Sequence, residues 1–328
     1  SWRRSARSSE AALKYFLVGA FVSGLLVYGI ALIYGASGTT ILPELRQQAV
    51  RLSGQPMFYI GSLLVLVSFA FKIAAVPFHM WAPDAYEGAP TPVSAFMMSS
   101  LKAAGFGGLV RIAVGALGTA ETAQQAYTGW IHTFAVLAIL TMTLGNLAAL
   151  RQDNIKRMLG YSSISHAGYL LIGVIAMSVV GDEARGPLLY YLMAYTITVV
   201  GGMAVVSWLG ADEKGEERVR LEDWAGLASQ RPGAALAMTI CLLSLGGFPP
   251  TASFFGKFYL FKIALEKSSM MPLVLIAIAN SLISVFYYLR IITAMYFRSP
   301  PSRPAVTPTD DAALSWSVLL ASLLILGL

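Results

Sequence analysis

Three lysines lie inside apolar runs, where a membrane-spanning helix normally carries no charge: Lys72, Lys102 and Lys257. Lys102 is the clearest case, because apolar or small residues surround it in the predicted unbroken span APTPVSAFMMSSLKAAGFGGLVRI. A lysine at the centre of a span costs about 2.5–3.5 kcal/mol even on the lenient insertion scale. Burial also disfavours the ammonium form, so an amine in this setting can take up and release a proton. These residues therefore predict proton transfer in the membrane interior.

Two of these lysines lie beside residues that break a helix. In FKIAAVPFHMW, Pro77 follows Lys72 and removes the N–H that would bond to residue 73. In LSLGGFPPTASFFGKF, the glycines and prolines of residues 246–250 precede Lys257. Broken backbone at membrane depth needs protein or a water-filled cavity to satisfy the freed groups. The mirrored order of lysine and proline predicts two inverted repeats, each with a discontinuous helix.

Two histidines extend the set of groups that can hold a proton. His79 follows Pro77, and His166 lies among three serines in LGYSSISHAGYLL. A histidine titrates near neutral pH and can carry the proton on either ring nitrogen. A buried histidine is commonly a structural residue, but the intramembrane lysines favour a relay here. We therefore expect a buried chain of lysine, histidine, hydroxyl groups and water, which is a proton path.

The elements that must position these groups are membrane helices. Of 328 residues, 56% are hydrophobic and 12% charged, and the mean hydropathy is +0.66, whereas soluble domains carry about 25% charged residues. We predict an all-α, polytopic membrane protein that forms a single membrane domain over residues 1–328. Spans need about 20 mainly apolar residues, and nine segments qualify: 11–34, 58–80, 92–114, 129–150, 160–180, 188–210, 234–262, 272–296 and 315–328.

The connectors between these segments predict the orientation in the membrane. With the N-terminus in the cytoplasm, most connector lysines and arginines fall on the cytoplasmic side, as the positive-inside rule requires. The net charge of +6 is thus a topology signal and not a nucleic-acid patch. The cytoplasmic side holds Arg3, Arg4, Arg7, Arg151, Lys156, Arg157, Lys214, Arg218, Arg220, Arg231, Arg298 and Arg303, and the other side holds Arg46, Arg51, Arg185 and Lys267.

Four blocks resemble the antiporter-like membrane subunits of respiratory complex I. They are EAALKYFLVGA, FKIAAVPFHMWAPDAYEGAPTPVSAFM, NIKRMLGYSSISHAGYLL and GFPPTASFFGKFYL, and they follow the family's order over nearly the whole chain. The related subunits L and M are similar overall. The form of WAPDAYEGAPTPVS, the GYSSISH sequence and the lysine of FFGKF favour the subunit N branch of the bacterial NADH–quinone oxidoreductase. The resemblance implies an inverted-repeat, antiporter-like fold.

The resemblance also implies a role for each intramembrane lysine. Lys72 matches the lysine of the first broken helix, which is usually paired with a glutamate of an earlier helix. Lys102 matches the lysine that connects the two halves of the path. Lys257 matches the lysine of the second broken helix, which leads towards the exit side.

Three further residues match the family on or near the path: His79, His166 and, at the cytoplasmic end of its span, Lys156. The sequence departs from the family in one respect, because the span with the partner glutamate should precede EAALKY. Glu10 lies in the expected loop and is no substitute. The sequence does not begin with Met and stops inside an apolar run, so we expect a fragment truncated at both ends relative to the family.

The resemblance implies a proton-translocating subunit that couples quinone reduction elsewhere in complex I to proton movement. Its expected partners are neighbouring antiporter-like and small membrane subunits, within the lipid bilayer of a bacterial inner membrane. We expect no cofactor in this subunit. NADH, flavin, iron–sulfur clusters and quinone are expected in partner subunits.

Two alternatives remain open at this stage. The same fold occurs in sodium–proton antiporters and membrane-bound hydrogenases, and sodium dependence would distinguish them. The second alternative is a structural spacer whose buried lysines are inert. The proton stoichiometry after lysine substitution would identify it. A redox enzyme is disfavoured, because the sequence has no GxGxxG after a strand, a single Cys241 and no paired haem histidines.

Overall fold

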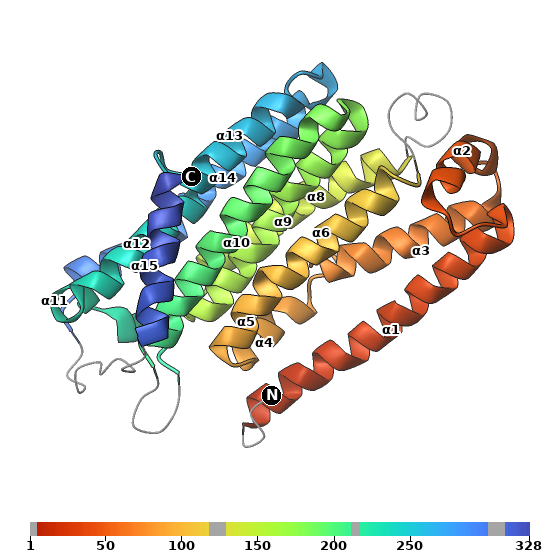
Figure 1. Cartoon of the computed structure of the whole chain (residues 1–328). Coiled ribbons are helices and arrows are strands. Elements are labelled where there is room, and N and C mark those ends of the chain that lie inside the picture. Colours follow the sequence, from red (N-terminus) through yellow and green to blue (C-terminus); the bar gives the residue numbers. More distant parts are fainter. Residues whose placement is uncertain (1–4, 118–128, 211–216, 301–311) are drawn as a thin grey trace.

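The computed structural model describes residues 5–117, 129–210, 217–300 and 312–328, which form a bundle of helices (Figure 1). The long helices run roughly side by side, and no strand forms within these ranges. The described part of the chain contains six helices that are long and apolar enough to cross a membrane, and three shorter apolar helices. The predicted all-α, multi-pass fold is therefore confirmed. Four residues of the topology prediction, Arg3, Arg4, Lys214 and Arg303, lie outside the described residues.

Each of the predicted spans contains one helix or a pair of helices divided by a break. The helices are α1 (Ala6–Ser37), α2 (Leu42–Leu52), α3 (Pro56–Lys72), α4 (Trp81–Gly88), α5 (Thr91–Met98), α6 (Ser100–Ala113), α8 (Gly129–Leu150), α9 (Ile155–Val179), α10 (Arg185–Trp208), α11 (Leu227–Gln230), α12 (Pro232–Gly246), α13 (Ala252–Ala264), α14 (Met271–Phe297) and α15 (Ala312–Gly327), with short 3-10 turns η1 (Asp182–Ala184), η2 (Leu221–Trp224) and η3 (Ser268–Met270).

Helix α9 is the central element, and nearly all of its residues are buried. It packs closely on α8, because glycine allows the two backbones to approach. A Cβ atom at Gly168 would lie 2.7 Å from the Met142 nitrogen and 2.9 Å from the Ala138 carbonyl oxygen of α8. Small residues at such contacts are typical of helix packing in membranes. Polar side chains on α9 are therefore held away from lipid on all sides.

Helix α1 is mostly exposed, in contrast to α9, and it lies at one edge of the bundle (Figure 1). It meets α3 through Gly29 and Gly61, where a Cβ on Gly29 would lie 2.8 Å from the Gly61 carbonyl oxygen. Its outer face exposes large apolar side chains, among them Phe16 and Phe21. Such a face suits a helix that borders the apolar part of a membrane.

The first predicted break is confirmed, because α3 ends at Lys72 and α4 begins at Trp81. Neighbouring groups satisfy the backbone that the break frees. The Val76 N–H donates to Thr141 Oγ1 of α8 at 3.0 Å. The Trp81 indole N–H donates to the Phe71 carbonyl oxygen at 3.2 Å. The irregular segment is thus supported by protein, which broken backbone inside a membrane requires.

The second predicted break is also confirmed, and the lysine beside it takes part. Helix α12 ends where Gly247 adopts a left-handed conformation with φ 80°, and α13 begins at Ala252. The Lys257 ammonium donates to the carbonyl oxygen of Leu245 at 3.1 Å. In a continuous helix that carbonyl would accept from residue 249, which is a proline and has no N–H.

The span around Lys102 is not the unbroken helix that the sequence predicted. Helices α5 and α6 are separated at Ser99, whose φ of −106° and ψ of −82° are not helical. The Ser99 hydroxyl donates to the Ala95 carbonyl oxygen at 2.6 Å. A local side-chain bond of this type commonly bends a helix. The expected straight helix is thus a bent one. It remains a single span, because the Ser99 N–H still donates to the Ala95 carbonyl oxygen at 3.1 Å.

Candidate proton-transfer site

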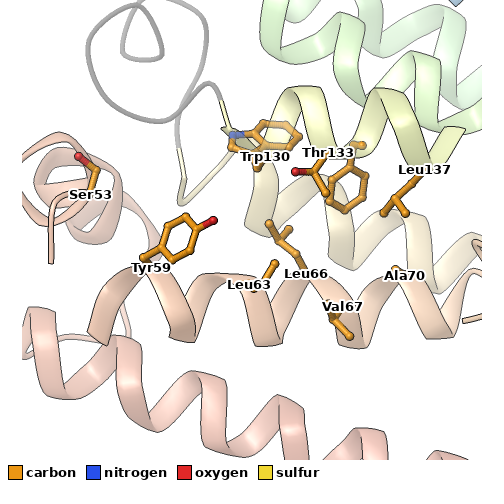
Figure 2. Close-up of a pocket in the computed structure, with 10 residues that line it drawn as sticks. Ser53, Tyr59, Leu63, Leu66, Val67, Ala70, Trp130, Thr133 and Leu137 are labelled. Atoms are coloured by element: carbon orange, nitrogen blue, oxygen red, sulfur yellow. The ribbon is translucent and has the colours of Figure 1, made fainter. Parts of the chain in front are cut away.

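A cavity between α3 and α8 lies apart from the predicted site (Figure 2). Its volume is ≈ 200 Å³, and its walls include Leu63 and Leu66 of α3 and Leu137 of α8. Its polar atoms come from groups such as Ser53 and Thr133. No lysine or histidine lines it. This cavity therefore offers no amine or imidazole group that could hold a proton.

Lys102 is buried and is held by the central helix. It is 1% exposed, and its Nζ atom donates to the carbonyl oxygen and to the hydroxyl of Ser163 on α9, each at 2.5 Å. The same ammonium group lies 5.9 Å from the centroid of the Tyr195 ring, and the Tyr195 hydroxyl donates to the Met98 carbonyl oxygen at 3.2 Å. Within the described part of the chain no carboxylate contacts this ammonium group. Hydroxyl groups, which both donate and accept, therefore surround a buried amine.

His166 lies one turn further along α9, in a second set of hydroxyl groups. It is 1% exposed. Its Nδ1 atom is 2.7 Å from the Tyr191 hydroxyl of α10, and its Nε2 atom is 3.3 Å from the Tyr288 hydroxyl of α14. The Tyr288 hydroxyl in turn lies 2.5 Å from Ser162 Oγ. Ser162 directly precedes Ser163, which binds the Lys102 ammonium group. The hydroxyl groups around Lys102 and those around His166 therefore lie next to each other on α9.

Lys257 completes the buried group on the far side of His166. It is 5% exposed, and its Nζ donates to Ser281 Oγ of α14 at 2.9 Å. The same ammonium lies 5.0 Å from the centroid of the Tyr169 ring on α9, within cation–π range. Tyr169 also packs edge-on against the His166 ring, with 5.6 Å between ring centroids. The structure thus brings Lys102, His166 and Lys257 together along one helix.

A buried amide cluster joins this group and was not predicted from the sequence. Asn146 of α8 donates to the Tyr169 hydroxyl at 3.2 Å and to the Asn280 carbonyl oxygen at 3.0 Å. The Tyr287 hydroxyl donates to Asn146 Oδ1 at 2.9 Å. The available signal was an asparagine within each of two apolar runs, TMTLGNLAAL and IAIANSLIS. The cluster holds the hydroxyl of Tyr169, against whose ring the Lys257 ammonium group lies.

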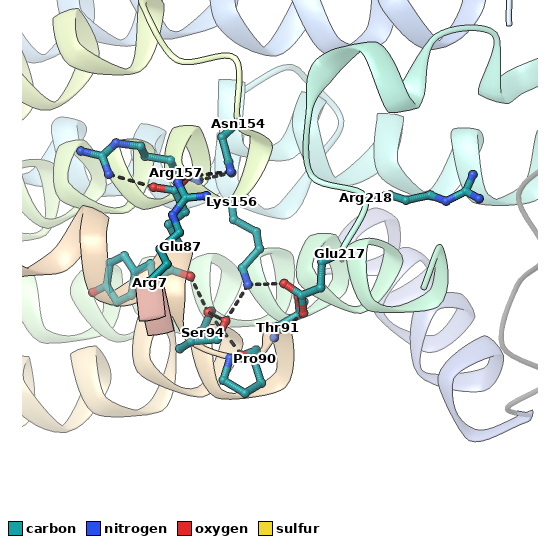
Figure 3. Close-up of polar contacts among 12 residues, drawn as sticks. Arg7, Glu87, Pro90, Thr91, Ser94, Asn154, Lys156, Arg157, Glu217 and Arg218 are labelled. Atoms are coloured by element: carbon teal, nitrogen blue, oxygen red, sulfur yellow. Dashed lines mark hydrogen bonds and ion pairs between the residues drawn. The ribbon is translucent and has the colours of Figure 1, made fainter. Parts of the chain in front are cut away.

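Lys156 lies at the end of α9 that carries the basic connectors (Figure 3). It is 0% exposed. Its Nζ donates to Glu217 Oε2 and to the Ala89 carbonyl oxygen, both at 2.6 Å. The other carboxylate oxygen of Glu217 accepts from the N–H of Thr91 at 3.0 Å and from its hydroxyl at 2.6 Å. Sequence reasoning placed Lys156 at this end but did not find Glu217, which comes from a distant connector.

A second ionic cluster lies beside this pair. Arg157 donates to Asp84 Oδ1 at 2.7 Å and to Glu87 Oε2 at 2.9 Å. Arg7 pairs with Glu87, and Lys14 donates to Asp84 at 2.9 Å. Burial raises the pKa of the Asp84 carboxyl, but the hydrogen bonds from Lys14 and Arg157 outweigh it and hold that pKa below its usual value. The cluster is a set of fixed counter-charges that ties α1 and α9 to α4.

Lys72 and His79 differ from the other predicted site residues. The prediction that Lys72 is buried is wrong for this chain, because its side chain is exposed on a face of α3 that the described helices leave uncovered. It makes no hydrogen bond or ion pair with any residue that the structure describes, as expected without the partner glutamate. His79 is half-buried, and its Nδ1 atom has no hydrogen-bond partner among the described residues. Neither residue contacts the group around α9.

Comparison with known families gives one match over most of the chain. Residues 1–284 match the model of a family described as NADH:quinone oxidoreductase/Mrp antiporter, transmembrane. The match includes the candidate residues from Lys72 to Lys257 and the partner Glu217.

Curated relatives are similar over almost the whole chain. NADH-quinone oxidoreductase subunit N 1 of Sorangium cellulosum is 45% identical over 99% of this chain and 65% of its own length. NADH-quinone oxidoreductase subunit N of Trichlorobacter lovleyi is 48% identical over 90% of this chain and 59% of its own length. The chain therefore spans about two thirds or less of the length of these two relatives.

Solved structures share the fold. A chain of respiratory complex I from Thermus thermophilus with bound aureothin superposes with a TM-score of 0.81 at 35% identity, over 100% of this chain and 68% of that one. A chain of the Mrp complex from Dietzia sp. superposes with a TM-score of 0.83 at 22% identity, over 98% of this chain and 65% of that one. At that identity the second likeness shows the fold alone.

Proposed function

Because the chain belongs to the NADH:quinone oxidoreductase/Mrp antiporter transmembrane family, we propose that it forms most of a proton-translocating membrane subunit of the subunit N type. In the assembled complex this subunit moves protons while quinone is reduced elsewhere. The chain is a multi-pass protein of the bacterial plasma membrane. Its partners in this proposal are the other membrane-arm subunits of complex I.

The observation that carries this proposal is the buried group of Lys102, His166 and Lys257 around α9. Three proton-holding side chains in the interior of a membrane protein are costly to bury and mark a pathway by default. Here they are bonded to hydroxyl groups and ring faces, and the described residues give none of the three a carboxylate to neutralise it. A group of this composition is suited to passing a proton and poorly suited to anchoring the fold.

In the proposed mechanism a proton passes along α9 in short steps. A proton held on Lys102 passes to the Ser163 hydroxyl, and water would carry it on to the Ser162 hydroxyl, because consecutive side chains of a helix do not face each other. Ser162 bonds to Tyr288, whose hydroxyl lies within hydrogen-bond range of His166 Nε2. The imidazole can accept on one nitrogen and release from the other. Water beside Tyr169 would carry the proton from His166 to Lys257. Lys257 then releases it through the break between α12 and α13.

The proposal assigns no redox chemistry to this chain. NADH, flavin, iron–sulfur clusters and quinone belong to partner subunits. The described residues hold no group of three or more His, Cys, Asp or Glu side chains placed to bind a metal ion.

Lys102→Met tests the proposal in the full-length chain within its assembled complex. Methionine keeps the volume of the side chain but cannot hold a proton. We expect NADH-driven proton uptake into proteoliposomes to fall by about 10²-fold or more, the loss typical of removing a positioned proton-transfer group. Lys262→Met is the matched control, because Lys262 is an exposed lysine of α13, and it should behave as the unmodified complex.

The alternatives predict other outcomes of the same assay. A structural spacer with inert lysines predicts normal proton uptake in the Lys102→Met complex. A sodium–proton antiporter predicts that uptake requires sodium ions. We expect uptake that is independent of sodium and sensitive to Lys102→Met, and either opposite result contradicts the proposed function.

A further inference from the structure

The pair formed by Lys156 and Glu217 connects the protein interior to the surface. The Lys156 side chain is 1% exposed, whereas the Glu217 side chain is 26% exposed. One carboxylate oxygen therefore binds a buried ammonium group, while the side chain that carries the carboxylate is partly exposed to solvent (Figure 3). This is the geometry needed to pass a proton between water and an amine that water does not reach.

The neighbouring carboxylate of Glu87 has a different set of partners. Its oxygens accept from the guanidinium groups of Arg7 and Arg157 and from the Asn154 amide at 2.7 Å. A guanidinium group keeps its proton in proteins, so Glu87 is bound to cations whose charge does not change. Glu217 is paired with a lysine, which can release its proton when buried. Of these two carboxylates, Glu217 is the one placed for proton exchange.

The pair also faces towards the buried group. Ser163, which binds the Lys102 ammonium, follows Lys156 by two turns of α9, since an α-helix has about 3.6 residues per turn. The two side chains therefore lie on one face of α9, about 10 Å apart along the helix axis. Tyr86 of α4 packs against this face, because a Cβ atom at Gly160 would lie 3.1 Å from its ring. Lys156 is thus positioned at the outer end of the face that leads to Lys102.

We propose that Glu217 is the carboxylate through which Lys156 exchanges protons with the aqueous phase, and that the two residues form the entry gate of the path to Lys102. This proposal rests on the proposed function, because a gate has a purpose only if protons pass beyond it. It assigns a role to the connector between α10 and α12, which supplies Glu217 from outside the buried group.

The gate works by one balanced proton transfer. A hydronium ion protonates the Glu217 carboxylate and leaves as water. The new O–H bond then breaks as an N–H bond forms on the neutral Lys156 amine, which regenerates the carboxylate beside an ammonium group. Release of a proton from that ammonium towards Lys102 restores the neutral amine. The hydrogen bonds from Thr91 hold the carboxylate in reach throughout.

Among the described residues, the charged groups beside the pair bind one another. The second ionic cluster joins Arg7, Lys14, Asp84, Glu87 and Arg157, and Asp153 pairs with Arg290. Arg218 points away from the Glu217 carboxylate (Figure 3). Of the described carboxylates, Glu217 is the one that contacts the Lys156 ammonium group.

Glu217→Gln tests the gate in the full-length chain within its complex. Glutamine keeps the shape and can accept from Thr91, but it removes the negative charge and the proton-exchanging group. Without the negative charge Lys156 holds its proton less tightly, so loading requires more acid. We expect slower proton uptake at neutral pH and a shift of the half-maximal pH to lower values by about one unit or more, the size of effect from a close opposite charge.

Two further variants separate proton exchange from a structural link. Glu222→Gln makes the same chemical change at an exposed position of η2 and should leave the rate and the pH midpoint unchanged. Thr91→Val removes the hydroxyl that holds Glu217 but keeps the carboxylate, so the pH midpoint should stay in place. If Thr91→Val slows uptake as much as Glu217→Gln and neither moves the midpoint, Glu217 is only a structural link and the proposal is wrong.

A Glu217→Gln complex with normal rate and midpoint would overturn the gate. If that variant does not assemble, Glu217→Asp takes its place. The shorter side chain moves the carboxylate away from Lys156, so slower uptake with a lower pH midpoint supports the gate, and an unchanged midpoint overturns it. Proton uptake by the Lys102→Met complex shows whether a negative result contradicts the gate alone or the proposed function as well. Loss of uptake in Lys102→Met together with normal uptake in Glu217→Gln contradicts the gate alone, whereas normal uptake in Lys102→Met contradicts the function itself.

Discussion

The two broken helices of the bundle use their lysines differently. At the break between α12 and α13, Lys257 is buried and donates to the freed Leu245 carbonyl oxygen and to Ser281. At the break between α3 and α4, a neighbouring helix supports the backbone, because Thr141 accepts from Val76. Lys72 takes no part there and is exposed. One lysine is integrated into its break, and the other is only adjacent to it.

The difference shows that a break and a lysine side by side in the sequence do not define one kind of site. A lysine that also satisfies freed backbone has two roles, and its removal leaves a buried carbonyl without its donor. A lysine that makes no hydrogen bond or ion pair with the described residues contributes nothing to the backbone of its break. Substitutions at Lys257, Lys72 and Thr141 distinguish these two situations.

Lys257→Met should have the largest effect, because it removes a proton-holding group and a backbone donor together. In the assembled complex we expect proton uptake to fall by about 10²-fold or more. The unpaired Leu245 carbonyl should in addition destabilise the complex by about 1–3 kcal/mol, measured as a lower thermal unfolding midpoint. Normal uptake with only a lower midpoint would reduce Lys257 to a structural donor.

Lys72→Arg and Lys72→Ala form the second test. Arginine keeps the positive charge but does not readily release a proton, so we expect both variants to lose proton uptake to a similar extent. Because Lys72 bonds to no described backbone group, neither change should lower the thermal unfolding midpoint as Lys257→Met does. Full uptake in the arginine variant would show that Lys72 is a fixed counter-charge.

Thr141→Val should have the smallest effect on transport. It removes the acceptor of the Val76 N–H and leaves that buried group unpaired, at an expected cost of about 1–3 kcal/mol in stability. The thermal unfolding midpoint of the complex should fall, while the number of protons moved per NADH stays the same. A changed proton count would mean that this break has a direct role in transport.

Much of this structure could be predicted from the sequence, because burial in a membrane leaves strong local signals. Long apolar runs gave the spans, and glycine and proline near Lys257 gave the second break. The burial of Lys102 and His166 followed from their position within apolar runs with no route to the surface. These properties depend on residues close together in the chain.

Contacts between distant segments could not be predicted in this way. Glu217 lies in a polar connector, and nothing near it indicates that it binds Lys156 on another element. The exposure of Lys72 depends on which helices cover α3, which local hydropathy does not report. Helix α2 was overlooked although a signal existed, since a proline and Glu44 occupy its first turn and Leu45 and Leu52 face the core.

The central claim is that the buried lysines carry protons and are not inert charges. Counting the protons moved per NADH oxidised in the Lys102→Met complex, at an electron flux matched to the unmodified complex, tests it most directly. We predict fewer protons per NADH, with the Lys262→Met control at the normal value. An unchanged count at the same flux would contradict the account.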